Sequence, residues 1–429
     1  MIGPTLALLG FSIALAWAVF AHGGVYIGGW AAALGIVGFT FIFSPKRTLA
    51  GGWAIWGLGV YSALQLVPLK LRVLQVLSPA RAQLEVFLGH LLPSITAAPL
   101  TVNPPLGMAG AFSLVGYILI FFGLRELSGR FQERPWIPVL PLIVLGALEA
   151  AIGISGIADN GLGAEDISGT YTNRDHFSGM LEMIFPLAVM AGWAMLRANL
   201  KAAMLVCVLW GLGILMFAGI LASVSRMGFL AGLASFVAVC ALSLGPRVSS
   251  RKGRLIVAAL MVSAALILLV VLPTVALMER FSYMSDAKGL SEDTRVYLAK
   301  GTVSLISEFP WFGIGGGGFE STFLKYQRES HMFRMEMAHN DYLQYLAELG
   351  MVGFALLVAT GLSVLIPLGR GIVRESDDGR RLLLVGCAGS LVAIGVHSLA
   401  DFNLHIQANA MILAWIAGIA SGNSKLLRG

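Results

Sequence analysis

The chain has 429 residues, of which 57% are hydrophobic and 12% are charged. A mean hydropathy of +0.82 excludes an ordinary soluble protein, because the apolar runs reach the roughly 20 residues that cross a bilayer. The net charge of +6 does not indicate nucleic acid as a partner, since the cytoplasmic loops of membrane proteins carry excess lysine and arginine. The three cysteines lie inside apolar runs without CxxC spacing, which argues against disulfides and metal.

Twelve apolar segments predict an all-α polytopic membrane protein, because long continuous runs favour helices over the alternating strands of a barrel. The segments lie near residues 1–20, 24–43, 51–67, 106–124, 136–157, 176–196, 202–224, 227–244, 255–278, 342–368, 382–399 and 406–419. The first lacks the basic leader and cleavage pattern of a signal peptide, so we interpret it as a retained span. We therefore expect a single integral membrane domain over residues 1–429.

The lysines and arginines between these segments predict the orientation. Of the 29 basic residues, 17 fall on the face that also carries both termini, and the short loops of the opposite face carry five. The positive-inside rule therefore places both termini in the cytoplasm. The loop at residues 279–340, between segments nine and ten, is then extracytoplasmic, and its 62 residues carry seven basic and eight acidic side chains. We expect the chemistry of the protein at this water-facing stretch.

Residues 68–105 form a second segment on the outer face. Within residues 68–92, charged side chains recur among leucines and valines at roughly helical spacing, namely Lys70, Arg72, Arg81 and Glu85. This pattern predicts an amphipathic helix that lies on the outer leaflet and contacts membrane lipids. The alternative is an irregular loop.

Three arginines are expected at the boundary between the membrane and its outer, extracytoplasmic face, where the positive-inside rule disfavours them. They are Arg174, Arg226 and Arg295. An arginine near the hydrocarbon edge is costly unless it is paired or functional, and its planar fork suits bidentate phosphate binding. Together they predict a phosphate site. Alternatively, each snorkels to the interface or pairs with a nearby acid such as Asp175 or Asp293. Arg226 has no acid within ten residues on either side.

His339 comes at the end of the long loop, immediately before an apolar helical pattern that starts at Tyr342. An imidazole at a helix N-terminus faces the positive end of the dipole, which favours the neutral ring and leaves a lone pair free to accept a proton. These are the properties of a general base. The alternative is that His339 or Asn340 is a helix cap, with Asp341 in the favoured first turn.

The remaining motifs are weaker. His176, close to Arg174, and His405, close to Asp401, are candidates for supporting positions. The glycine-rich run at residues 312–319 has neither the preceding strand nor the Gly-Lys-Ser/Thr of a nucleotide-binding loop, so a hinge is the simpler interpretation. No HExxH or paired Cys/His spacing indicates a metal site.

Several stretches, in this order, resemble the O-antigen ligase and O-antigen polymerase superfamily of bacterial envelope glycosyltransferases. They are Asn-Arg-Asp-His-Phe at residues 173–177, Ser-Val-Ser-Arg-Met-Gly at 223–228, Thr-Arg at 294–295, Glu-Phe-Pro-Trp-Phe-Gly-Ile-Gly at 308–315, and His-Asn-Asp-Tyr-Leu-Gln at 339–344 with Glu-Leu-Gly at 348–350. The resemblance covers residues 170–350, with the large outer loop in the family's place, and extends to the N-terminal third only as hydropathy.

The resemblance implies a multi-pass glycosyltransferase of C-type (GT-C) architecture in the bacterial inner membrane. It implies an undecaprenyl diphosphate-linked glycan as donor, an active site at the periplasmic face, and neither metal nor cofactor. By motif, Arg226 and Arg295 would bind the donor diphosphate, and His339 would take the proton from the attacking sugar hydroxyl. Arg174 would contact donor or acceptor. The candidates for supporting roles are Asn173, His176, Asn340, Asp341 and Tyr342.

These implied roles agree with elementary chemistry. A diphosphate leaving group needs fixed cations where its charge develops, and an attacking hydroxyl needs a base that works near neutral pH. The sequence has no obvious carboxylate pair for a covalent glycosyl intermediate, so the expected reaction is a single displacement with inversion.

The acceptor differs within the superfamily. Ligases transfer a finished glycan to lipid A-core, polymerases transfer a growing chain to another lipid-linked repeat of O-antigen or exopolysaccharide, and some relatives glycosylate pilin. Ligase and polymerase both stay open here, and a chain-length regulator is a candidate partner.

A transporter or flippase for lipid-linked oligosaccharide or polysaccharide is the competing class, because twelve spans suit it equally well. A transporter would show charged or Gly/Pro-broken spans that meet near the bilayer midplane. In this sequence the ionisable residues instead gather at the outer boundary, with few at mid-span, Glu149 and Glu182 among them. The enzyme is therefore the favoured prediction.

Overall fold

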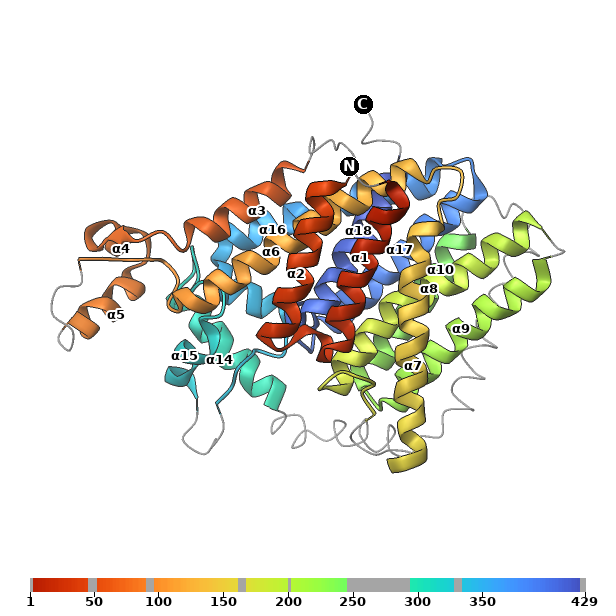
Figure 1. Cartoon of the computed structure of the whole chain (residues 1–429). Helices are drawn as coiled ribbons and strands as arrows, with labels where there is room; N and C mark the ends of the chain where they lie inside the picture. The colour runs from red at the N-terminus through yellow and green to blue at the C-terminus, as the bar shows by residue number, and fades with distance from the viewer. Residues whose placement is uncertain are drawn as a thin grey trace.

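A computed structural model describes residues 3–44, 52–89, 96–160, 167–199, 202–244, 294–327 and 334–424. Within these ranges the chain is almost wholly helical, and the sheet is the short antiparallel pair of β1 (Leu69–Lys70) and β2 (Ala97–Ala98) (Figure 1). The predicted all-α class is confirmed. The ninth apolar segment, residues 255–278, lies outside the described residues.

Seven helices of the described ranges are long and apolar enough to cross a membrane. They are α6 (Pro104–Arg130), α7 (Leu140–Asn160), α8 (Arg174–Ala198), α9 (Ala203–Ala222), α10 (Arg226–Leu244), α16 (Asp341–Arg374) and α17 (Asp378–His397). The first three predicted segments are the shorter apolar helices α1 (Pro4–Phe20), α2 (Ile27–Phe43) and α3 (Trp53–Leu64), and the last is α18 (Gln407–Asn423). Together they form a polytopic membrane protein.

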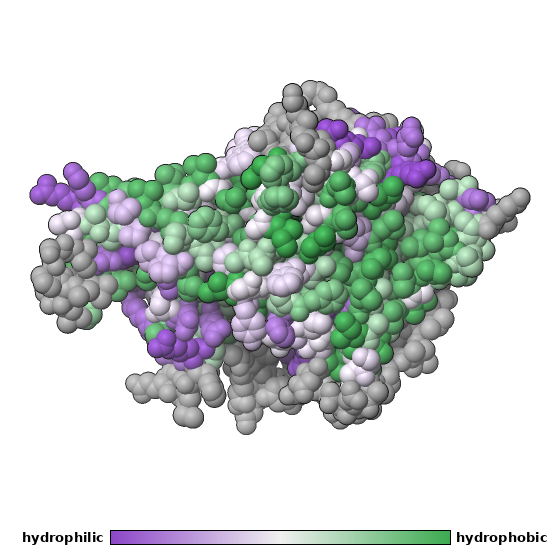
Figure 2. All heavy atoms as spheres, viewed as in Figure 1, coloured by the Kyte–Doolittle hydropathy of each residue, from purple (hydrophilic) through white to green (hydrophobic). Residues whose placement is uncertain are grey.

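Apolar side chains cover much of the outer surface, which is what a bilayer requires of helices that face lipid. Met204 on α9 and Ile27 and Ile42 on α2 are each more than 70% exposed. Figure 2 shows these helices as a broad hydrophobic band, with hydrophilic patches above it at one end and below it at the other. The start of α1 lies at the upper edge, whereas α14 (Thr294–Glu308) and α15 (Phe319–Phe323) lie at the lower edge (Figure 1).

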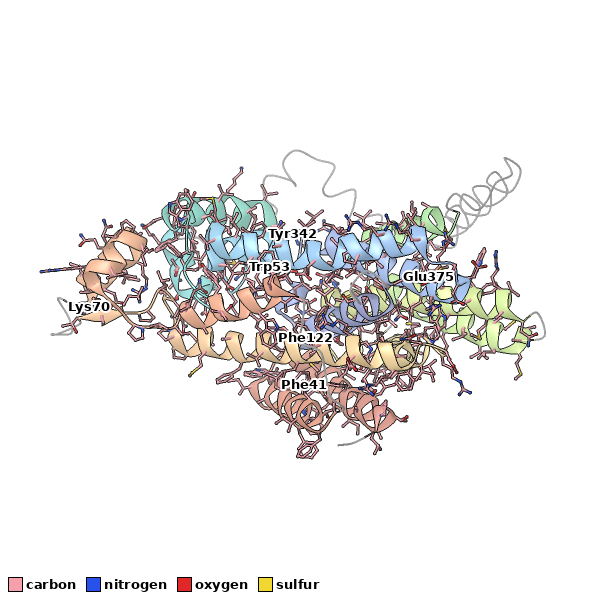
Figure 3. All side chains as sticks on the ribbon, turned by 90° about the horizontal axis from the view of Figure 1, so that it is seen from above. Phe41, Trp53, Lys70, Phe122, Tyr342 and Glu375 are labelled. Atoms are coloured by element: carbon pink, nitrogen blue, oxygen red, sulfur yellow. The ribbon has the colours of Figure 1, made fainter. Side chains whose placement is uncertain are left out.

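The N-terminal helices pack in layers against the C-terminal half of the chain. Figure 3, seen from above, shows α6, which carries Phe122, between the α1–α2 pair, which carries Phe41, and α3, which carries Trp53. On its other side α3 packs against α16. Trp56 of α3 stacks on Phe122 with ring centroids 5.3 Å apart. These contacts fix α3 between α6 and α16.

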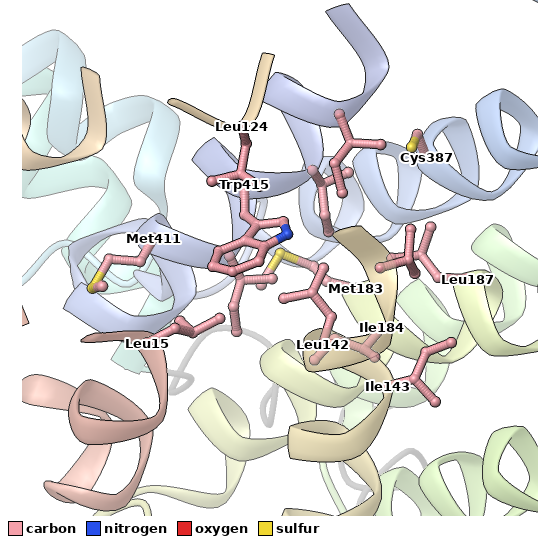
Figure 4. Close-up of a cluster of buried hydrophobic side chains, with 14 of the residues drawn as sticks. Leu15, Leu124, Leu142, Ile143, Met183, Ile184, Leu187, Cys387, Met411 and Trp415 are labelled. Carbon is pink, nitrogen blue, oxygen red and sulfur yellow. The ribbon is translucent and has the colours of Figure 1, made fainter. Parts of the chain in front are cut away.

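The largest core cluster surrounds α8, α17 and α18. Trp415 of α18 is fully buried, and Figure 4 shows it among Leu15 of α1, Leu124 of α6 and Met183 of α8. Its indole Nε1 donates to the carbonyl of Pro138, 2.9 Å away, so the only polar atom of the ring is satisfied. The core therefore holds α8 from several sides, and α8 is 78% buried over its most apolar window.

The segment at residues 68–105 contains two short helices, α4 (Leu71–Leu77) and α5 (Pro79–Gly89), beside the β1–β2 pair. It extends from one end of the body, where Figure 3 labels Lys70. Arg81 and Glu85 form a buried ion pair 2.5 Å long within α5, instead of facing solvent. Apolar side chains are exposed here, including Val76 and Phe87. Its position on the outer leaflet stays a prediction.

The glycine-rich run is built into a sharp kink of α16 at Gly350, where φ is 64° and ψ is −178°. The carbonyls of Ala347 and Glu348, before the kink, accept from the backbone N–H groups of Ile314 and Gly315 at 3.0 and 2.9 Å. The N–H groups of residues 351 and 352, after the kink, donate to the carbonyls of residues 310 and 311. The run therefore satisfies the helical hydrogen bonds that the kink breaks, and it is a packed joint instead of the expected hinge.

Replacing Gly350 by alanine should destabilise the fold strongly. Its Cβ would lie 2.4 Å from the carbonyl oxygen of Trp311 and 2.5 Å from the backbone nitrogen of Gly313, at a positive φ that alanine disfavours. We expect a loss of at least about 2 kcal/mol, seen as a lower melting temperature in detergent. Gly361→Ala in the same helix is the control, because its Cβ meets nothing within 4 Å and should not lower stability. Equal melting temperatures for the two variants would contradict the joint.

Candidate active site

The first turn of α8 places Arg174 as the first residue of a well-anchored helix. Asn173 caps this helix, because its side-chain oxygen accepts from the backbone N–H of Asp175 at 2.8 Å. The preceding loop is fixed by Glu149 of α7, which accepts from the backbone N–H and the hydroxyl of Thr170 at 3.0 and 2.7 Å. Arg174 therefore projects from a helix N-terminus whose backbone is held on both sides.

Arg295, from the long segment at residues 279–340, contacts the same turn of α8. It is the second residue of α14, and its Nη2 lies 3.4 Å from Oδ2 of Asp175. The two side chains are 29% and 19% exposed, so this ion pair is partly shielded from water. The expected alternative was an acid nearby in the sequence, and Arg295 pairs instead with Asp175, 120 residues earlier. This pair brings Arg295 to the residue that directly follows Arg174.

Arg226 is the first residue of α10, which also begins against α8. Ser225 precedes it and accepts from the backbone N–H of Gly228 at 3.1 Å, which closes the first turn. A Cβ on Gly228 would lie 2.4 Å from the hydroxyl of Ser178 in α8, so the two helices approach very closely. Val224 has φ of 53°, a strained value for a β-branched residue.

His339 precedes α16 in an unusual backbone conformation, with φ of 48°. Asn340 caps α16 by accepting from the backbone N–H of Leu343 at 3.0 Å, so His339 itself is not the cap. The side chain of Gln344 holds the approach to this turn by accepting from the N–H of Ala338 at 2.7 Å. The His339 side chain is 36% exposed, which leaves part of the ring accessible to a substrate.

A buried aspartate, Asp401, lies beneath the ring of His339. Nδ1 of His339 is 3.3 Å from Oδ1 of Asp401, and this carboxylate is inaccessible to solvent. Nε2 of His176 lies 3.7 Å from the other oxygen of Asp401. The ring of Phe402 makes edge contacts with both imidazoles, at 4.7 Å from His176 and 4.8 Å from His339. Asp401 therefore couples His339 to the first turn of α8.

Asp401 is held in its ionised form. Burial raises its pKa, but the hydrogen bond with His339 and the neighbouring imidazoles of His176 and His397 outweigh burial and hold the pKa well below its usual range. A carboxylate that accepts from Nδ1–H of His339 fixes the tautomer in which Nε2 carries the lone pair. Nε2 of His339 is then the atom able to accept a proton.

A second polar cluster supports the start of α16. Asp341 is buried and accepts from the hydroxyl of Ser398 at 2.8 Å and from Nδ1 of His405 at 2.9 Å. Nε2 of His405 faces Glu348, 3.6 Å away, and Glu348 also accepts from the backbone N–H of Gly317 at 3.2 Å. The cluster therefore ties the turn of His339 to the glycine-rich run.

Stability should depend on pH through His405. Burial lowers its pKa, but the carboxylates of Asp341 and Glu348 outweigh burial and raise it to about 10. The pKa of a histidine in the unfolded chain is about 6.5. The stabilisation of the fold by the charged His405 is therefore complete below that pH and disappears as pH rises through about 10. We expect His405→Gln to lower the melting temperature at pH 6 and to lower it much less at pH values above 10. A difference independent of pH would show that His405 acts by packing alone.

Three helices, α10, α14 and α16, therefore begin near the first turns of α8. Each of the four helices carries one candidate residue at or just before its start. Arg174, Arg226 and Arg295 lie in first turns of α8, α10 and α14, and His339 precedes α16. Helix N-termini present free N–H groups and the positive end of the dipole, which favours anions. Among the described residues, no group of three or more His, Cys, Asp or Glu side chains is placed to hold a metal ion.

The comparisons with known proteins agree with this arrangement. Residues 211–358 match a family model described as O-antigen ligase. Over this range, about a third of the chain, the protein is similar to that family, and the matched range is called the O-antigen ligase domain below. This match confirms the predicted relationship to the O-antigen ligase and polymerase superfamily, and at the family level it supports a membrane glycosyltransferase that acts on a lipid-linked glycan and an acceptor. No curated protein matches the chain.

The O-antigen ligase domain contains Arg226, Arg295 and His339, whereas Arg174 and Asp401 lie outside the matched range. Contacts with α8 bring these parts together: the Arg295–Asp175 ion pair, the close approach at Gly228, and the chain from His339 through Asp401 to His176. The candidate site therefore combines residues of the matched range with residues from helices on both sides of it.

The other predicted residues have scaffolding contacts. Asn173 and Asn340 are helix caps, and Asp341 is buried under the start of α16. The hydroxyl of Tyr342 donates to the carbonyl of Gly395 at 2.7 Å, which fastens α16 to α17. The structure thus gives each of them a part in positioning the turn or helix that carries a candidate residue, and their roles in catalysis stay predictions.

Asp401 was missed as the partner of His339. The available signal was the polar interruption at residues 398–405 between two apolar segments, with His397 four residues before Asp401 and His405 four residues after it. Nothing local in this pattern pairs Asp401 with a histidine 62 residues earlier. The contact follows from the packing of α16 against α17 and η5 (Asn403–His405).

Proposed function

We propose that this protein transfers a glycan from an undecaprenyl diphosphate-linked donor to a sugar hydroxyl of an acceptor. The observation that carries the proposal is the joining of three arginines at helix N-termini with a carboxylate-supported histidine around one turn of α8. Arginines and helix N-termini favour a diphosphate, and the histidine suits a hydroxyl nucleophile. The O-antigen ligase domain supports the same chemistry.

The proposed step is a single displacement at the anomeric carbon. The acceptor oxygen forms a bond to that carbon while its proton passes to Nε2 of His339. The bond from the carbon to the diphosphate oxygen breaks, and undecaprenyl diphosphate leaves with the electron pair. Arg226 and Arg295 stabilise the charge that develops on the diphosphate, and Arg174 contacts donor or acceptor. Attack opposite the leaving group inverts the anomeric configuration.

We place the reaction at the periplasmic face of the bacterial inner membrane, in a GT-C type of architecture. Support comes from the basic short loops on the side of the termini and from the position of α14 and α15 at the edge opposite the start of α1. The lipid tail of the donor would then enter from the bilayer, while the acceptor hydroxyl arrives from the aqueous side.

The acceptor class is tested by deleting the gene and restoring it with the wild-type sequence. Surface polysaccharide is then separated on gels that resolve lipid A-linked from free polymer. A ligase restores a ladder on lipid A-core from preformed long chains, whereas a polymerase restores chain length itself, in which case a chain-length regulator is the expected partner. Unchanged polysaccharide in the deletion strain would contradict both.

A further inference from the structure

A buried chain of ionisable groups continues from Asp401 into the interior, beyond the residues that the proposed reaction uses. Nδ1 of His397, the last residue of α17, lies 3.0 Å from both carboxylate oxygens of Glu182 in α8. Nε2 of His397 lies 3.8 Å from Oδ2 of Asp401. His397 and Glu182 are both inaccessible to solvent. The order of groups is therefore Glu182, His397, Asp401 and His339.

The geometry assigns a positive charge to His397. Nδ1 hydrogen-bonds to Glu182, and Nε2 lies 3.8 Å from Asp401 without a hydrogen bond, so the buried ring stands between two carboxylates whose charge favours the imidazolium. A neutral ring would direct a lone pair at one carboxylate, and two buried carboxylates would then share no cation between them. Glu182 stabilises this charge from the side opposite Asp401.

The other charged or titratable groups around Asp401 come from α8, the segment before α16, α16 and η5. From α8, Asp175 is paired with Arg295, and His176 is buried with Nε2 3.7 Å from Asp401 and neither ring nitrogen hydrogen-bonded. From the segment before α16 comes His339, and from α16 and η5 comes the paired Asp341–His405 cluster. Among these neighbours of Asp401, His397 is the imidazole that lies between Asp401 and a second buried carboxylate, to which it is hydrogen-bonded.

This charge bears on what His339 has to do. Asp401 alone attracts a proton onto His339, and a base that is already protonated cannot accept the proton of a hydroxyl. A cation on the far side of Asp401 offsets that attraction, while Asp401 still orients the ring. Asp401 then orients the ring of His339 without causing that ring to take up a proton before the acceptor hydroxyl arrives.

We propose that His397, kept charged by Glu182, is a positioning residue that acts through Asp401 and keeps His339 free to accept a proton at neutral pH. This inference rests on the proposed function, because it assumes that His339 is the base. His397→Gln removes the positive charge nearest Asp401, whether Glu182 then stays ionised or takes up a proton. In either case His339 should hold its proton up to a higher pH.

The test is the pH profile of transfer by full-length protein. Purified wild type or variant is added to membranes of the deletion strain, which supply their own lipid-linked glycan and acceptor, and initial rates are followed on gels between pH 5 and 9. For His397→Gln, we expect the acid limb of the profile to move upward by about one pH unit. Ser390→Ala is the matched control. The hydroxyl of Ser390 donates to the backbone carbonyl of Met183 across the same α8–α17 contact, and it carries no charge. Its profile should equal that of wild type.

A buried Glu182 without its cation could prevent His397→Gln from folding. The double variant Glu182→Gln/His397→Gln leaves no uncompensated charge in the pair and should show a shift in the same direction. An acid limb at the wild-type position in a folded variant overturns the inference, and so does failure of both variants to fold, since the pair would then be a purely structural element. His339→Ala in the same assay separates the two proposals: if it transfers glycan normally, the proposed function itself fails.

Discussion

Replacing His339 by alanine is expected to reduce glycan transfer by about 10²–10⁴-fold, the range that a positioned general base contributes. The reason lies in the geometry of the ring, which Asp401 orients through Nδ1 and which remains partly exposed. Loss of the imidazole removes the proton acceptor and leaves the donor-binding arginines in place. The rate should therefore fall while binding of the lipid-linked donor changes little. Initial rates at several donor concentrations separate these effects.

The matched control is His22→Ala. His22 is an exposed histidine that also has a positive φ, 59°, so the backbone cost of placing alanine there is similar. We expect its transfer rate to remain near that of wild type. If His339→Ala retained wild-type activity at normal protein levels, the assignment of the base would be wrong, and the transporter alternative would regain weight.

Replacing Arg226 by lysine should reduce transfer by about 10²–10³-fold, close to the loss caused by removing one donor that stabilises transition-state charge. Lysine keeps the positive charge but lacks the planar fork that binds two phosphate oxygens at once. The strained backbone at Val224 and the tight contact at Gly228 define the backbone position from which this side chain extends. Arg295→Lys should behave similarly.

The control for both arginine variants is Arg197→Lys, at the other end of α8. Arg197 forms an exposed ion pair of 2.8 Å with Asp378, and such surface pairs contribute little. Its transfer rate should be unchanged. Wild-type rates for Arg226→Lys would show that charge alone suffices there, and wild-type rates for Arg226→Ala would remove this residue from the site.

Much of the helical framework could be predicted from the sequence, because the length of an apolar run is a local property. The seven long helices coincide with predicted segments. The third segment was predicted over residues 51–67, yet α3 ends at Leu64 and is 12 residues long. After it, the side chain of Gln65 donates to the carbonyl of Phe312 at 2.8 Å, and Pro68 has no N–H with which to continue a helix. A contact with a distant loop thus overrides the local apolar pattern.

The candidate site could be predicted only in its parts. Arginine at a membrane boundary and histidine before an apolar helix are local signals, so Arg174, Arg226, Arg295 and His339 could be selected from the sequence. The partner Asp401 could not, because tertiary packing alone brings it to His339. The same holds for the glycine-rich run, whose role became visible only once it was seen to complete the backbone hydrogen bonds of the kink at Gly350.

The measurement that tests the central claim most directly is the release of undecaprenyl diphosphate during transfer by the purified full-length protein. Membranes of the deletion strain supply donor and acceptor, EDTA is present throughout, and the anomeric configuration of the new linkage is determined by NMR. We expect one undecaprenyl diphosphate for each glycan transferred, with inverted configuration, and release slower by about 10²–10⁴-fold with His339→Ala. Movement of intact lipid-linked glycan across the membrane without release of undecaprenyl diphosphate would contradict the account and indicate a transporter.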